Sequence, residues 1–153
     1  MNKQAGKLKA IWLKRGRRGV MDAVDQADTI AHRGLANNTD QGGKRQVTIL
    51  SKEVWDDLMQ QVGASLDPST RRANLLVTGI DLADTRGQTL QVGTVRIRIY
   101  GETKPCERMD EVAFGLREAM YENWGGGAYG EVLDDGQIAI GDPVAWLDES
   151  LEG

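Results

Sequence analysis

The chain has 153 residues, a formal net charge of −4 at pH 7, one cysteine and one histidine. This length is typical of one domain and allows about 70% of the unfolded surface to be buried. The single cysteine excludes a disulfide within the chain, and with one histidine it also excludes a self-contained zinc or iron–sulfur site. The negative charge argues against general nucleic-acid binding, and no apolar run approaches the roughly 20 residues of a membrane span. Because the N-terminus lacks an apolar signal and the thiol is unpaired, we expect a cytoplasmic protein.

The first half of the chain predicts two strands and one helix. Alternating apolar residues predict a strand over 7–13, within a basic stretch (1–20) that holds seven cations and no acid. We interpret that stretch as a solvated surface. Residues 21–44 are rich in Asp, Asn, Gly and Gln without a clear period, so we expect mostly loop there. The run 46–50 predicts a strand, after which Ser51 caps a helix that ends at Val62.

The second half predicts more strands and one further helix. Strands are expected over 74–80, 88–92, 94–100, 128–133, 137–140 and 144–147, and a helix over 110–121. Gly93 marks one turn, and Asp134-Asp135-Gly136 predicts a hairpin between the strands on either side. Many short strands with two helices indicate a mainly β fold, a strand-rich barrel or curved sheet with the helices packed on it. No repeat or linker divides the chain, so we expect a single domain over 1–153.

The single cysteine, Cys106, follows a proline in a loop after a predicted strand. Lys104, Arg98 and Arg108 make its sequence neighbourhood basic. A thiolate is a nucleophile and a soft metal ligand, so such a loop suits metal or sulfur chemistry. The structural alternative is a small buried hydrophobic residue, because free cysteine is among the most buried residue types.

Two other segments favour an anionic ligand. Arg72 and Asn74 lie in a polar loop that leads into an apolar strand, and a guanidinium binds phosphate or carboxylate in a bidentate manner. Lys44 and Arg45 follow two glycines, and backbone amides near glycines together with cations also suit an anion. Surface ion pairs and solvated turns are the structural alternatives for these residues. For His32, a hydrogen-bonded structural role is favoured over a general base.

These pieces occur in an order that resembles the MOSC domain, the family named for the C-terminal domain of molybdenum cofactor sulfurase. The resemblance covers about residues 30–147 and rests on the segments Arg45–Leu50, Arg72–Ile80, Leu90–Val95, Gly101–Cys106 and Gly127–Asp142. Many members carry Gly-x-x-Gly-Asp before the first core strand. Here Arg33–Asn38 lacks the second glycine and the aspartate.

The resemblance implies a barrel-like fold, a molybdenum–pterin cofactor and a functional cysteine at Cys106. It implies that Cys106 is a candidate metal ligand, and that Arg72 and Asn74 belong to the pocket, with Lys44 and Arg45 near the anionic part of the cofactor. The chain is then the cofactor subunit of a reductase of N-hydroxylated compounds that needs a separate electron donor. Two alternatives stay open: a sulfur carrier that uses a Cys106 persulfide beside a cysteine desulfurase, and a non-catalytic cofactor-binding module.

Overall fold

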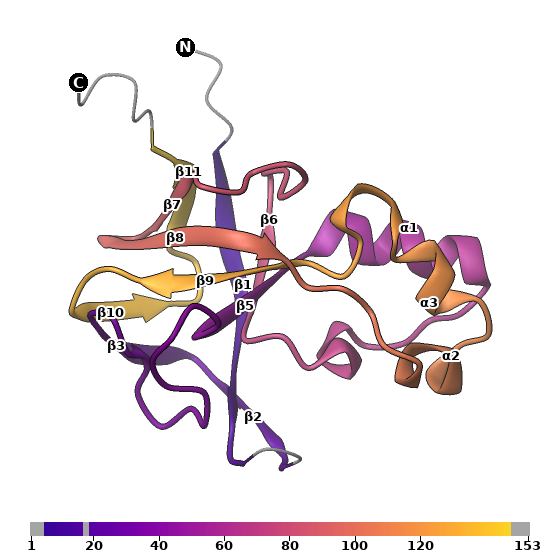
Figure 1. The fold of residues 1–153 in the computed structure, drawn as a ribbon, viewed down its shortest axis with the longest axis horizontal. Helices are drawn as coiled ribbons and strands as arrows, with labels where there is room; N and C mark the ends of the chain where they lie inside the picture. Colours follow the sequence, from indigo (N-terminus) through magenta and orange to yellow (C-terminus); the bar gives the residue numbers. More distant parts are fainter. Residues whose placement is uncertain (1–4, 17–18, 148–153) are drawn as a thin grey trace.

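A closed barrel of seven strands forms one end of the molecule in the computed structural model, which describes residues 5–16 and 19–147 (Figure 1). Its strands run in the order β11-β7-β8-β9-β5-β6-β1, and pairing of β1 with β11 closes the ring. The strands are β1 (Ala5–Lys14), β5 (Val47–Ser51), β6 (Leu75–Thr78), β7 (Thr89–Val92), β8 (Val95–Glu102), β9 (Ala128–Val132) and β11 (Pro143–Trp146). The predicted mainly β, barrel-like fold is confirmed.

The barrel interior is filled by alternate residues of its strands. In β8, Val95, Ile97 and Ile99 are buried, whereas the residues between them are more exposed. Leu8 of β1 and Leu75 of β6 have no exposed surface. Because successive side chains of a strand point to opposite faces, an alternating sequence produces this core directly.

A small second sheet corrects two predictions from the sequence. It pairs β10 (Gly136–Ala139) with β3 (Gln26–Ile30), and β3 with β4 (Gly34–Leu35). In the larger sheet, β2 (Met21–Val24) pairs antiparallel with the C-terminal part of β1. The prediction of mostly loop over 21–44 is therefore wrong for these strands, whose polar residues are held by pairing. The predicted hairpin is also wrong, because β9 already pairs with β5 on one edge and β8 on the other, so β10 joins β3 instead.

Three helices pack beside the barrel as a second lobe (Figure 1). The helix α1 (Lys52–Val62) begins where Ser51 Oγ accepts a hydrogen bond from Val54 N at 3.3 Å, as predicted. The predicted helix over 110–121 is instead two short ones, α2 (Arg108–Val112) and α3 (Leu116–Ala119). Extended backbone at Ala113 and a φ of 85° at Gly115 separate them.

Buried side chains from the three helices share one apolar cluster against the barrel. Its members include Trp55, Leu58 and Met59 of α1, with Leu116 and Met120 from the α3 region. Two single turns, η1 (Pro68–Arg71) and η2 (Glu122–Trp124), lead back into β6 and β9. In the described part of the chain, none of the helices is long and apolar enough to cross a membrane.

Candidate functional site

A small polar pocket lies where four connecting segments meet at one end of the barrel. Its enclosed volume is about 30 Å³, which is room for about one water-sized group. The segments converge because β5 runs parallel to β6 and antiparallel to β9, so that Ile49 pairs with both Leu75 and Ala128. The lining residues are Arg45, Thr48, Arg71, Arg72, Ala73, Thr103 and Gly126.

Arg71 is the central cation of this pocket. Its Nε donates to the Gly126 carbonyl at 3.1 Å, and its Nη2 donates to the Thr103 carbonyl at 3.2 Å. Among the described residues, no carboxylate pairs with it, and its hydrogen bonds leave Nη1 unused. Backbone carbonyls therefore fix the guanidinium without neutralising its charge.

The electrostatic surroundings of Arg71 favour a bound anion. Burial lowers the pKa of Arg71 from its ordinary value, attraction to Cys106 opposes that effect, and repulsion from Arg45 adds to it. Two guanidinium groups thus share a partly enclosed space without a described carboxylate between them. An anion in this space would relieve the repulsion and restore the interactions that burial removes.

Close backbone approach at Gly126 makes this arrangement possible. A Cβ at Gly126 would overlap the Thr103 carbonyl oxygen and would lie 3.0 Å from Arg71 Nη2. Only glycine therefore lets the segment before β9 lie against the segment after β8. The Thr103 hydroxyl is buried at the same place and has no hydrogen-bond partner among the residues that the structure describes.

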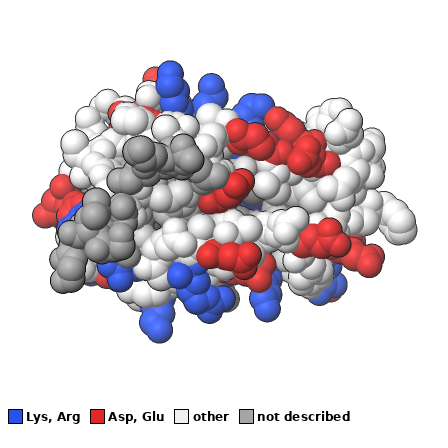
Figure 2. Space-filling model, turned by 90° about the horizontal axis from the view of Figure 1, so that it is seen from above, with Lys and Arg blue, Asp and Glu red and all other residues white. Residues whose placement is uncertain are grey.

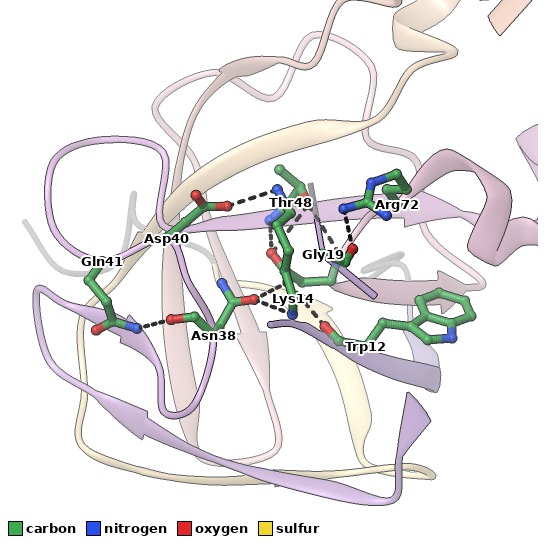
Figure 3. A network of polar contacts seen from close by, with 9 residues as sticks. Trp12, Lys14, Gly19, Asn38, Asp40, Gln41, Thr48 and Arg72 are labelled. Carbon is green, nitrogen blue, oxygen red and sulfur yellow. Dashed lines mark hydrogen bonds and ion pairs between the residues drawn. The ribbon is translucent and has the colours of Figure 1, made fainter. Parts of the chain in front are cut away.

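Arg72 lies at the rim of the pocket in a different role. It ends η1 with a φ of 65°, in the left-handed region, and its Nη2 donates to the Gly19 carbonyl at 2.8 Å (Figure 3). This bond ties the loop before β6 to the segment between β1 and β2. Arg72 and Arg71 are sequence neighbours, but the left-handed turn gives them different partners.

Asn74 lies beside the pocket-lining Thr48, at the centre of a buried polar network whose members Trp12, Asn38 and Thr48 are labelled in Figure 3. Its Oδ1 accepts from Thr48 N at 3.0 Å, and its Nδ2 donates to the Trp12 carbonyl at 3.0 Å and to Asn38 Oδ1 at 3.1 Å. With 2% of its surface exposed, Asn74 has both ends of its amide engaged within the protein. Of the residues that line the pocket, Thr48 is hydrogen-bonded to Asn74, and Ala73 precedes it in the chain.

Cys106 lies on the loop that continues from Thr103 towards α2. The residue is exposed, and its carbonyl accepts from Met109 N at 3.0 Å as α2 begins. It does not line the pocket, but it is close enough to Arg71 for their attraction to oppose part of the lowering of the Arg71 pKa by burial. The exposed thiol therefore lies in the neighbourhood of the Arg71 guanidinium.

Lys44 and Arg45 lie against aromatic rings on the outer face of the barrel. Arg45 stacks 5.5 Å from the centre of the Tyr129 ring and also lines the pocket. Lys44 lies 5.8 Å from the centre of the Tyr100 ring, outside the pocket lining. Cation–π contacts of this kind hold long basic side chains in place without neutralising them.

Five site residues were predicted from the sequence. The structure brings two of them, Arg72 and Arg45, to the pocket and places Cys106 beside it. Asn74 is buried beside the pocket-lining Thr48, and Lys44 lies outside the lining. The other five lining residues, Arg71, Thr48, Ala73, Thr103 and Gly126, were not among the predicted site residues. A second arginine in the loop before β6 was a visible signal for Arg71. Only the tertiary contact between the Gly126 and Thr103 segments reveals the others.

Comparison with solved structures shows the same fold in longer and in similarly sized chains. YuaD from Bacillus subtilis is 18% identical with a TM-score of 0.77, covering 95% of this chain and 97% of its own. YiiM from Geobacillus stearothermophilus is 16% identical with a TM-score of 0.72, covering 94% of this chain and 76% of its own. YiiM from Escherichia coli is 14% identical with a TM-score of 0.69, and the match covers 93% of this chain and 70% of the YiiM chain.

Comparison at the level of sequence families identifies one match. No curated protein sequence matches the chain significantly. The MOSC domain family matches residues 10–145, which is most of the chain. The resemblance seen in the ordered motifs is thereby confirmed, and the chain belongs to the MOSC domain family.

Proposed function

We propose that this chain binds a molybdenum–pterin cofactor, with the anionic part of the cofactor at Arg71 and with Cys106 as the metal ligand. The observation that carries the proposal is the uncompensated charge of Arg71, which is held by carbonyls and lies beside Arg45. Membership of the MOSC family, which is associated with this cofactor, supports the choice of ligand.

The pocket fits one part of the cofactor and not another. An enclosed volume of about 30 Å³ admits a group of the size of a phosphate oxygen and is too small for a ring system. Arg71, Arg45 and Arg72 would hold the phosphate, because guanidinium groups match its geometry. The Thr103 hydroxyl would donate to the same group, and the Cys106 thiolate would hold the metal.

A bound cofactor would supply two-electron chemistry at the metal. In the proposed reaction an N-hydroxylated compound takes up two electrons and two protons and yields the reduced nitrogen compound and water. With one cysteine and one histidine, the chain cannot build an iron–sulfur centre of its own, so a separate protein must deliver the electrons. The single thiol also suits the reducing cytoplasm, where we propose that the chain works.

The exposure of Cys106 favours a second candidate function. An exposed thiolate can accept a sulfane sulfur from the persulfide of a cysteine desulfurase and pass it to an acceptor thiol or metal centre. The carrier would then need no bound cofactor. Both functions use the same sulfur atom but differ in whether metal accompanies the protein.

The test is to purify the chain from a host that makes the cofactor and to measure molybdenum, pterin and persulfide per protein. We expect pterin and molybdenum near one per chain. Arg71→Gln should lower both about tenfold or more, since hydrogen bonds to charged groups contribute strongly. Arg86→Gln, at an exposed arginine outside the pocket lining, serves as the matched control and should change neither.

Variants of Cys106 separate the candidate functions. Cys106→Ser should keep the fold, because the residue is exposed, and should lose the metal through the missing thiolate. A reducible extra sulfur on Cys106 without molybdenum would support the carrier instead. Cofactor at full content without turnover would indicate a binding module, and full content in Arg71→Gln would refute the proposed site.

A further inference from the structure

The segment that follows Cys106 presents large apolar side chains to solvent. Phe114, the one phenylalanine of the chain, is 95% exposed, and Val112 and Tyr121 are 40% and 50% exposed. We call these three residues the Phe114 face. Grouped exposed apolar residues in one short segment are typical of an interaction surface.

The other large aliphatic residues of this segment are buried, so the segment is anchored to the molecule. Met109, Leu116 and Met120 are at most 5% exposed and anchor the segment in the apolar cluster beneath α1. The left-handed turn at Gly115 allows the chain to reverse between α2 and α3, which leaves Phe114 at the outside. One side of the segment is therefore core and the other side is open.

An open hollow lies beside Phe114. Its volume is about 450 Å³, and it is formed between the C-terminal end of α1, the end of α3 and the turn at Phe114 and Gly115. The lining residues are Gln61, Val62, Phe114, Gly115, Glu118 and Ala119. Phe114 is part of the lining of this shallow, open hollow, so that its exposed ring and the hollow form one surface that a partner can cover.

The charge around the Phe114 face selects the partner. Residues 106–124 hold five acidic and two basic residues, and all five acids are exposed. Asp57 of α1 is exposed and lies beside Ala119 and Glu122, so it adds to this negative charge, and acidic side chains are visible over the helical part of the molecule in Figure 2. A second copy of the chain would bring the same negative charge and be repelled, whereas a basic surface would be attracted.

We propose that the Phe114 face is the docking site of the electron-donor protein, a flavin or iron–sulfur protein whose docking surface is apolar at its centre and basic at its rim. This inference rests on the proposed function, because the reduction of an N-hydroxylated compound consumes two electrons that the chain does not hold. The position fits, because the segment that carries the face begins at Cys106, the proposed metal ligand. A donor seated there contacts the segment directly connected to the reacting centre.

The test places a photo-crosslinking residue, p-benzoylphenylalanine, at position 114 of the full chain in cells that make the cofactor. The same residue at position 140 is the matched control, because Ile140 is also an exposed apolar residue, 45% exposed, but lies near β10 at the other end of the molecule. We expect one dominant adduct at 114 with a flavin or iron–sulfur protein, absent at 140. Raising the salt from about 0.05 M to about 0.5 M should lower its yield several-fold, because charge attraction is screened.

Three results would overturn the proposal: no adduct above the control, an adduct with a second copy of the chain, or an adduct with a protein that carries no redox group, a cysteine desulfurase included. Phe114→Ser adds a kinetic arm. It should raise the KM for the crosslinked donor about tenfold or more, as loss of a central aromatic contact does, while turnover with a small chemical reductant stays unchanged. An unchanged KM for the donor would also overturn the proposal.

Failure of docking and failure of cofactor binding give different results. The crosslinking is repeated in the Arg71→Gln background, where the proposed function predicts little cofactor. An adduct that persists there with the redox protein supports docking by itself, even if the wild-type chain proves to hold no molybdenum. Full cofactor content with no adduct would retain the proposed function and refute the docking site.

Discussion

Replacement of Asn74 by alanine tests whether this residue supports the fold or is available to a ligand. In the structure its amide joins β5, β1 and the segment at Asn38. Asn74→Ala leaves two buried backbone groups, Thr48 N–H and the Trp12 carbonyl, without these partners. Each such group costs about 1–3 kcal/mol, which gives about 2–6 kcal/mol in total. A loss of this size is a large part of the roughly 5–15 kcal/mol by which proteins of this kind are stable.

The free energy of unfolding is measured by urea denaturation, followed through tryptophan fluorescence. We expect a lower midpoint with an unchanged slope, since the surface exposed on unfolding stays nearly the same. Asn74→Asp is the matched variant of equal size. It places an acceptor against the Trp12 carbonyl and Asn38 Oδ1, and should destabilise at least as much. A loss below about 1 kcal/mol in both variants would refute the structural role, because that is the size expected of a solvated surface bond.

Three further predictions concern residues near the pocket, the outer barrel face and α1. Gly126→Ala should separate the segment before β9 from Thr103 and lower cofactor content, measured as pterin per protein; unchanged content would contradict the close-approach argument. Tyr100→Phe should remove the hydrogen bond that most lowers the pKa of Glu131, and the stability it contributes is present above the ordinary pKa of 4.5 and lost as pH falls through the lowered value. The same bond raises the pKa of Tyr100 above 10.0, so its contribution is also lost as pH rises through that raised value. The free energies of unfolding of the wild type and of Tyr100→Phe should therefore differ only between the lowered pKa of Glu131 and the raised pKa of Tyr100. A difference that stays constant across pH would contradict this pairing. Ser51→Ala should cost about 1 kcal/mol through loss of the α1 cap, checked by thermal unfolding, and no loss would show that the cap is dispensable.

Alternation and capping, both local properties, made the barrel strands and α1 predictable from the sequence. The buried positions of β8 repeat every second residue, and Ser51 ends a strand and caps the helix that follows it. The loop before β6 was also recognisable as a candidate anion site from its arginines. The order of the motifs along the chain was by itself enough to indicate the MOSC family.

Pairing partners, in contrast, were decided by the tertiary structure. The turn residues at 134–136 favour a local hairpin, but both edges of β9 are occupied, so β10 pairs with β3 far away in the sequence. Polar residues of β3 form a strand for the same reason. Hydrogen bonds between distant segments override local preference, and such bonds leave no periodic signal in either segment.

The site shows the same division between local and tertiary information. The sequence indicated that a cysteine and several cations were available, because their chemistry is a property of each side chain. The enclosure of Arg71 depends on the left-handed turn at Arg72 and on the carbonyls of Thr103 and Gly126, which are 32 and 55 residues away in the sequence. It also depends on the missing Cβ of Gly126, which lets those two segments touch. The amide of Asn74 is buried, and a buried amide needs hydrogen-bond partners within the protein, so Asn74 belongs to the polar network and not to the pocket lining. Residue chemistry is therefore readable along the chain, whereas charge compensation and burial exist only once distant segments are packed together.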